Sequence, residues 1–185
     1  MAATESKMIP LGTEAPNFKL KDVVSGKVYS LDDFRNGKPL LVMFICNHCP
    51  YVMHIIEKLV EITRMYIQKG VNVVAINPND YDKYPEDSPE KMVEYANRFN
   101  YPFPYLLDET QETAKEFGAT CTPDFFLFDK HLKLIYRGQF DDSRPGNNLP
   151  VNGEDLSKAL EFALLDKEID FLQKPSVGCS IKWKK

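Results

Sequence analysis

The hydrophobic pattern of the chain alternates between short apolar runs and a long segment with helical periodicity. Residues 40–45 (LLVMFI) and 71–76 (VNVVAI) are almost wholly apolar, which is typical of strands covered on both faces. Between them, from Pro50 to Gly70, apolar residues recur on one face and charged residues on the other. The three segments predict a βαβ unit with parallel strands and a right-handed crossover.

Two more elements are predicted on either side of this unit. Residues 17–31 (NFKLKDVVSGKVYSL) read as a β-hairpin turning at Ser25 and Gly26, followed by a helical turn over residues 31–34. Ser88 and Pro89 are suitable N-cap and first residues of a helix that follows the polar loop after residue 76. We therefore expect a hairpin before the βαβ unit and a helix after it.

The second half of the chain predicts a short helix, another hairpin and a closing helix. Asp108 and Gln111 resemble a capping box for a helix that ends at Gly118. Residues 125–138 predict two antiparallel strands with a turn at 129–131, and residues 154–165 predict an amphipathic helix. The residues after this helix have no periodicity, so we expect an irregular tail.

This order of elements is that of a thioredoxin-like fold, an α/β fold with a central mixed sheet flanked by helices. Its N-terminal β-hairpin and C-terminal tail are additions to the sheet and helices. A length of 185 residues suits one domain with a substantial core. We expect a single domain over residues 1–185, with an N-terminal extension at 1–12 and a tail at about 168–185.

Charge and targeting signals narrow the possible partners. The net charge is −4, and the only basic run is the short group Lys182, Lys184 and Lys185. Nucleic acid and anionic membranes are therefore not expected as partners. Neither a signal peptide nor a membrane-spanning stretch is recognisable, so we expect a cytoplasmic protein.

The spacing of the cysteines indicates redox chemistry or metal binding. In a reducing compartment, closely spaced cysteines favour redox work or metal binding over a structural disulfide framework. Cys46 and Cys49 have CxxC spacing at the junction of the first buried strand and its helix. Pro50 suits the first helical position, which makes Cys49 the N-cap, where free N–H groups favour a thiolate. We predict that Cys49 attacks and Cys46 resolves, an order that reverses if the loop exposes Cys46 more. His48, if protonated, would lower the thiol pKa further.

Several segments resemble a known family. They are GTEAPNFKL, CNHCPYV, NPNDYDKYPEDSPEKM, FPYLLDETQ, TPDFFLFD, RGQFDDSRP and GCSIKWK. Together they are similar to the bacterial thioredoxin-fold redoxins that have the motif FICNHCPYV. Aligned on the thioredoxin pattern, Cys49 occupies the nucleophile position. The usual second cysteine falls on Val52, so the CxxC here is displaced backward to Cys46.

The resemblance also implies a second part of the site. It places the Thr122–Pro123 bond at the cis-proline position that faces the dithiol in thioredoxin-like proteins. Thr122 would then present its backbone to an incoming peptide for strand-like hydrogen bonds. Cys121 would lie beside it, so that Cys46, Cys49 and Cys121 converge on one shallow site. Cys179 is expected to be an incidental thiol of the tail.

Three functions remain open. The leading one is a thiol-disulfide oxidoreductase that needs no bound cofactor and acts on protein or small-molecule disulfides with a thiol reductant. The second is a peroxiredoxin-like thiol peroxidase, since the hairpin and APNFKL also resemble peroxiredoxins. Peroxiredoxins have a threonine three residues before the peroxidatic cysteine, and Cys46 stands there. The third is a zinc or copper(I) site built from Cys46, Cys49, Cys121 and His48, although no second CxxC supports it.

Overall fold

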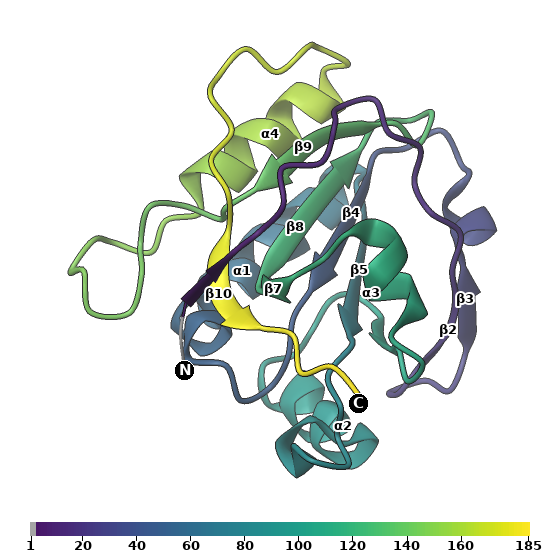
Figure 1. Ribbon diagram of the computed structural model, residues 1–185. Coiled ribbons are helices and arrows are strands. Elements are labelled where there is room, and N and C mark those ends of the chain that lie inside the picture. The colour runs from purple at the N-terminus through teal and green to yellow at the C-terminus, as the bar shows by residue number, and fades with distance from the viewer. Residues whose placement is uncertain (1–2) are drawn as a thin grey trace.

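The structure is a computed structural model that describes residues 3–185. Its centre is a seven-stranded mixed sheet in the order β3-β2-β6-β5-β4-β8-β9 (Figure 1). The strands are β2 (Lys19–Asp22), β3 (Val28–Ser30), β4 (Leu40–Phe44), β5 (Asn72–Asn77), β6 (Tyr105–Leu107), β8 (Asp124–Phe128) and β9 (Leu134–Gly138). The mixed sheet predicted from the sequence is confirmed.

The predicted βαβ unit forms the middle of this sheet. β4 pairs in parallel with β5 on one side and antiparallel with β8 on the other. The connecting helix α1 (Pro50–Lys69) ends at Gly70, whose φ of 105° is left-handed and therefore suits glycine. All five residues of β4 are buried, which explains why its sequence is apolar without alternation.

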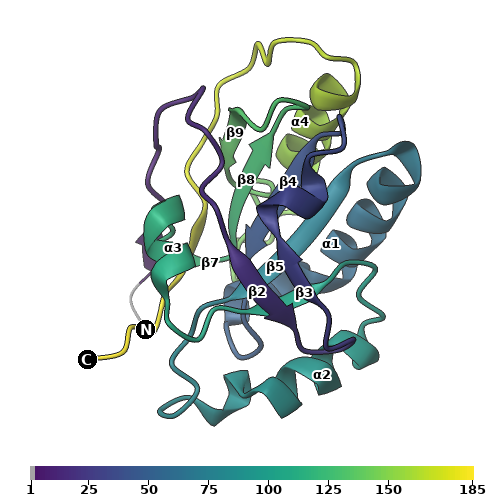
Figure 2. The same ribbon diagram turned by 90° about the vertical axis from the view of Figure 1, so that its right-hand side faces the viewer.

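Helices cover the sheet on both faces. Figure 2 shows α1 and α4 (Glu154–Leu164) on one face and α3 (Glu112–Phe117) on the other. Because side chains alternate along a strand, β4 supplies Leu41 and Met43 to the core under α1 and Leu40 and Val42 to the core under α3. The remaining helical elements are α2 (Pro89–Arg98) and the short 3-10 helices η1 (Leu31–Phe34) and η2 (Pro85–Asp87).

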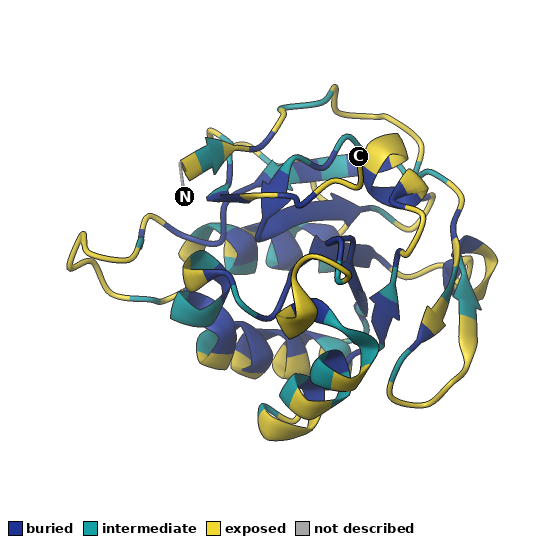
Figure 3. Cartoon of the chain, turned by 60° about the horizontal axis from the view of Figure 1, so that its bottom comes forward, coloured by how far each residue is buried: buried dark blue, intermediate teal, exposed yellow. Residues whose placement is uncertain are grey.

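Burial follows these layers. Figure 3 shows buried residues along the sheet and on the inward faces of the helices, with exposed residues on their outward faces. Among the helices of residues 3–185, none is both long and apolar enough to cross a membrane.

The predicted capping box of α3 is wrong. Gln111 is itself the N-cap, with a left-handed φ of 64°. Its side-chain amide donates to the buried carbonyls of Pro78, at 2.6 Å, and Lys182, at 2.8 Å. Asp108 instead accepts from the amide of Ala114, at 2.8 Å. The Gln111 side chain is therefore used to satisfy two buried carbonyls, which need a hydrogen-bond donor, and not to cap the helix.

The tail is not irregular. It contains strand β10 (Val177–Ser180), which lies between β1 (Ala3–Glu5) and β7 (Cys121–Thr122) in a three-stranded antiparallel sheet (Figure 1). A four-residue strand gives almost no periodic signal, and its partners come from distant parts of the chain. The ends of the described chain therefore meet beside the segment that precedes Pro123.

Candidate active site

The carboxyl end of β4 and the start of α1 hold the CxxC pair. Cys46 lies in the loop after β4, and Cys49 is the N-cap of α1 with extended backbone angles (φ −72°, ψ 123°). Pro50 is the first helical residue, as the sequence predicts. The first-turn amides of α1 have no partners within the helix, so they are available to a sulfur at this position.

Thr122 holds both sulfurs from the opposite side. In its protonated form the Cys49 thiol donates to the carbonyl of Thr122 at 3.2 Å, and the Cys46 sulfur lies 3.2 Å from the Thr122 hydroxyl. The Thr122–Pro123 peptide bond is cis, as the resemblance implies. The cis-proline segment therefore faces the dithiol through the residue that precedes the proline.

The two thiols differ in acidity. The hydrogen bond from the Cys46 side chain lowers the pKa of Cys49 to about 5 against the opposing effect of burial. The side chain of Cys179 and the backbone amides of Val52 and Cys179 add to this lowering. Burial raises the pKa of Cys46 well above its usual value, and its hydrogen bond to Cys49 adds to the rise. At neutral pH the pair therefore consists of one thiolate, on Cys49, and one thiol, on Cys46.

The role of Cys121 in this cluster stays a prediction, although the charges of Cys49 and Cys179 are among the causes that raise its pKa. Its sulfur donates to the Pro123 carbonyl at 3.7 Å, and burial raises its pKa. The thiol that hydrogen-bonds Cys49 alongside Cys46 is Cys179, which the sequence analysis treated as incidental. Cys46, Cys49 and Cys179 belong to the same apolar cluster under α1. We call these three residues the thiol cluster.

His48 contacts a carboxylate, and the charge of Cys49 is among the causes that raise the His48 pKa, so a protonated His48 in turn favours the Cys49 thiolate, as the sequence predicts. Its Nδ1 lies 2.6 Å from the Oδ2 of Asp87, and this hydrogen bond raises the pKa of His48. The imidazole also stacks on Tyr84, with ring centroids 5.7 Å apart and planes 6° from parallel. A ring nitrogen of His48 also lies within 4.8 Å of the Cys46 sulfur.

Asp87 is the centre of a polar network that the sequence analysis missed. Its buried carboxylate accepts from the Asn47 amide at 2.7 Å and from the side-chain amides of Asn79 and Asn77 at 2.8 and 3.2 Å. Burial acts to raise the pKa of Asp87, but the hydrogen bonds from His48 and these amides hold it below its usual value. The sequence does contain a signal for this network, which is the polar run after β5. The carboxyl ends of adjacent parallel strands such as β4 and β5 lie at one edge of a sheet, so polar residues that follow them can meet there.

A metal fits this arrangement poorly. Ligand atoms of Cys46, His48 and Asp87 lie within 4.8 Å of one another, which is the spacing of a possible site. However, both oxygens of Asp87 are already taken by the amide donors and His48. Cys121, a predicted ligand, is bonded to a backbone carbonyl instead. The donor set does not supply the four free ligands of a structural zinc site.

Neither sulfur of the CxxC pair reaches the surface. Cys46 is 1% exposed and Cys49 is 0% exposed. Beside Pro123 the surface hollow measures only about 10 Å³, and its lining includes Tyr51, Phe140, Arg144 and Val177. A larger reactant therefore reaches the dithiol only after β10 or the 139–145 loop moves.

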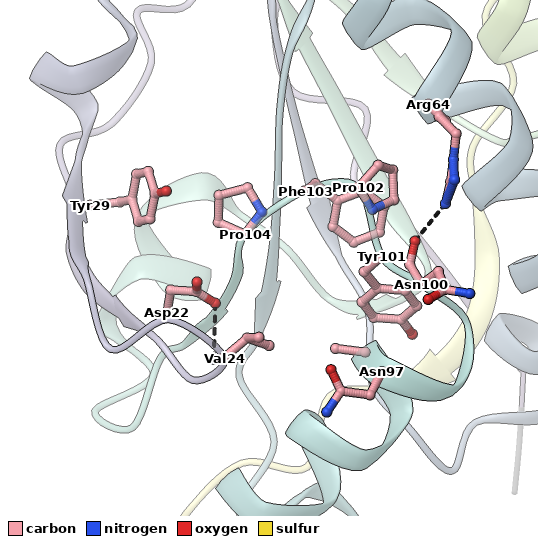
Figure 4. A pocket seen from close by; sticks show the side chains of 11 residues that line it. Asp22, Val24, Tyr29, Arg64, Asn97, Asn100, Tyr101, Pro102, Phe103 and Pro104 are labelled. Carbon is pink, nitrogen blue, oxygen red and sulfur yellow. Dashed lines mark hydrogen bonds between the residues drawn. The ribbon is translucent and has the colours of Figure 1, made fainter.

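A wider hollow lies away from the thiols (Figure 4). It measures about 700 Å³, and its lining includes Tyr29, Arg64 and Tyr101 but none of the cysteines. Arg64 is held there by donating to the Asn100 carbonyl at 2.6 Å. This hollow contains no nucleophile and no arrangement suited to redox chemistry, so the candidate site remains the thiol cluster.

The family model described as Redoxin matches residues 10–154. The chain belongs to the Redoxin family. Among curated relatives, this redoxin is 29% identical over 131 residues to thiol-disulfide oxidoreductase ResA of Geobacillus thermodenitrificans, covering 71% of this chain and 70% of the relative. It is 28% identical over 143 residues to the chloroplastic peroxiredoxin Q of Populus jackii, covering 72% and 62%. The first relative agrees with the predicted enzyme class, an oxidoreductase.

Solved structures confirm the fold of this redoxin. An uncharacterized conserved protein from Geobacillus kaustophilus is 54% identical, with a TM-score of 0.97 over 100% of this chain and 97% of that one. A protein from Sinorhizobium meliloti 1021 is 45% identical, with a TM-score of 0.95 over 98% of each chain. A thioredoxin-family thiol:disulfide interchange protein from Chlorobium tepidum TLS, 19% identical, has a TM-score of 0.64 over 84% of this chain and 99% of that one. The thioredoxin-like fold is thereby confirmed.

Proposed function

We propose that this redoxin is a thiol-disulfide oxidoreductase in which Cys49 attacks and Cys46 resolves. The proposal rests on one observation above all. The Cys49 sulfur lies at the start of α1, next to Cys46, with a pKa of about 5. The relatives named as thiol-disulfide oxidoreductases support the same class of reaction. The substrates are disulfides of proteins or small molecules, and the reductant is a thiol.

The first step is attack by the Cys49 thiolate on one sulfur of the substrate disulfide. A bond forms between that sulfur and Cys49 while the substrate disulfide breaks, and the departing thiolate takes a proton from water. The low pKa of Cys49 keeps the nucleophile ionised at neutral pH. The Val52 amide, which hydrogen-bonds this sulfur, stabilises the negative charge.

The second step is resolution by Cys46. Burial keeps Cys46 protonated in the resting protein, so it must lose its proton before it attacks the Cys49 sulfur. That attack forms the Cys46–Cys49 disulfide and releases the second half of the substrate as a thiol. Two electrons have then passed from the dithiol to the substrate, and an external thiol restores the dithiol.

The proposal is tested by mapping the disulfide. Tryptic residues 36–58 contain both Cys46 and Cys49 in one peptide. After mild oxidation we expect this peptide to be lighter by two hydrogen atoms, and to recover its mass after reduction. Cys49→Ser should abolish the change, and Cys121→Ser should leave it intact. The proposal fails if Cys46 and Cys49 remain alkylatable while substrate disulfides are turned over.

A thiol peroxidase is the second candidate, and the burial of the site favours it. A peroxide is small enough to approach sulfurs that β10 and the 139–145 loop shield from a protein substrate. Cys49 would be oxidised to a sulfenic acid, releasing water, and Cys46 would close the disulfide. The similarity to peroxiredoxin Q agrees with this reading.

We expect peroxide turnover to be slower than disulfide turnover. The residue three before Cys49 is Cys46, whose thiol is a weak donor to a peroxide oxygen. The Thr122 hydroxyl is already within 3.2 Å of Cys46. Stopped-flow rates of the reduced protein with hydrogen peroxide and with oxidised glutathione, compared with Cys49→Ser, decide the matter. A faster, Cys49-dependent reaction with peroxide would assign the protein to the second class.

A further inference from the structure

Strand β10 places Cys179 directly against the residue that faces the nucleophile. In the antiparallel pairing of β10 with β7, Cys179 is opposite Thr122. The Thr122 carbonyl oxygen also lies 3.2 Å from the Cys49 sulfur. The approach is so close that a Cβ on Gly178 would lie 2.0 Å from the Thr122 carbonyl oxygen. The lack of a side chain at Gly178 therefore allows β10 to pack directly against the cis-proline segment.

The sulfurs of Cys49 and Cys179 share the start of one helix. Both side chains belong to the same buried cluster, and each is among the groups that shift the pKa of the other. The first-turn amide of Val52 helps to lower the pKa of Cys49, and the amide of Tyr51 acts in the same direction on the pKa of Cys179. Cys46 and Cys179 thus both approach Cys49 within the thiol cluster.

We propose that Cys179 is a second resolving thiol, which forms a disulfide with Cys49 and so ties β10 to the start of α1. This inference rests on the dithiol function proposed above. It adds a residue that lies outside the CxxC motif and more than a hundred positions further along the chain. Burial raises the pKa of Cys179 to about 12, so Cys179, like Cys46, is a protonated thiol beside the Cys49 thiolate.

The step conserves atoms and electrons. Once Cys49 is joined to half of a substrate disulfide, Cys179 loses its proton and attacks the Cys49 sulfur. The bond between Cys49 and the substrate breaks, and the substrate leaves as a thiolate that takes up the proton. Two electrons pass from Cys49 and Cys179 to the substrate. Cys46 can then attack Cys49, which moves the disulfide to Cys46–Cys49 and returns Cys179 to the thiol form.

The location of β10 gives this disulfide a consequence for substrates. The resemblance implies that the Thr122 backbone receives an incoming extended peptide, but β10 already occupies that edge. Cys179 stands where the reactive cysteine of such a peptide would lie. A protein substrate must displace β10, and a Cys49–Cys179 disulfide would prevent that displacement until it is transferred or reduced.

Peptide mapping of oxidised variants tests the inference. Residues 36–58 and residues 168–182 are separate tryptic peptides, because trypsin does not cut before Pro39 or Pro175. Reduced full-length Cys46→Ser protein is treated with oxidised glutathione, alkylated and digested without reductant. We expect a cross-link between these two peptides through Cys49 and Cys179. The same cross-link is expected as a minor species in the wild-type protein at limiting oxidant.

Matched variants separate the possible outcomes. Adding Cys121→Ser to Cys46→Ser should preserve the cross-link, whereas adding Cys179→Ser should leave Cys49 joined to glutathione. If Cys179 stays alkylatable and the cross-link is missing from both the Cys46→Ser and the wild-type protein, the inference is overturned. The proposed function is judged separately, by the change of mass within residues 36–58 of the wild-type protein.

Discussion

Replacing Cys46 with alanine is expected to slow the alkylation of Cys49 by more than about tenfold near pH 6, because the variant loses the largest influence that lowers the Cys49 pKa. Only the thiolate reacts with iodoacetamide, so the wild-type rate should rise as pH increases through about 5 and then level off. In Cys46→Ala the whole curve should move to higher pH. The measurement is the rate of Cys49 modification by mass spectrometry between about pH 4 and pH 10.

Two controls make this result specific. Cys46→Ser retains a hydroxyl that can donate to Cys49, so its curve should lie between those of the wild type and Cys46→Ala. Cys49→Ser should lose the acidic reaction altogether. If Cys46→Ala kept the wild-type midpoint, the acidity of Cys49 would have to come from the first-turn amides and Cys179 alone.

Replacing Gly178 with valine is expected to open the site. The added Cβ would lie 2.0 Å from the Thr122 carbonyl oxygen and 3.1 Å from the Pro123 nitrogen. Because these are backbone atoms, the clash can be relieved only if β10 moves away from β7. We therefore expect β10 to separate from β7 and both CxxC sulfurs to become accessible. Alkylation near pH 8 should accelerate by more than about tenfold, with a loss of about 1–3 kcal/mol in the free energy of unfolding.

Ser180→Val is the matched control, since Ser180 is an exposed residue of the same strand. It should leave both the alkylation rate and the stability close to those of the wild type. An unchanged rate in Gly178→Val, with the protein folded by circular dichroism, would show that β10 does not guard the dithiol.

The sequence predicted the elements whose signals are local. The apolar run of β4, the helical period of α1 and the Cys49–Pro50 start are written in consecutive residues, and the structure has them where expected. The hairpins and the cis bond at Pro123 also agree. The cytoplasmic location and the single domain stay predictions.

The missed features depend on pairings across long stretches of chain. His48 adjoins Cys49 in sequence, but its partner Asp87 comes from the loop after β5. Cys179 looked incidental because four residues of strand give no period, and because its neighbours in space are Thr122 and the start of α1. The role of Cys121 stays a prediction, because a position in sequence does not give the direction of a side chain within a strand.

The three-stranded sheet also determines when during synthesis the thiols become protected. Ala3 pairs with Cys179, so β10 can take its place only after Cys179 has left the ribosome, long after the βαβ unit has done so. Such distant pairings are the slowest to form. Until then the βαβ unit can assemble with Cys46 and Cys49 uncovered. A nascent chain thus presents a reactive dithiol to the thiols and disulfides around it, and the later arrival of β10 converts it into the closed site.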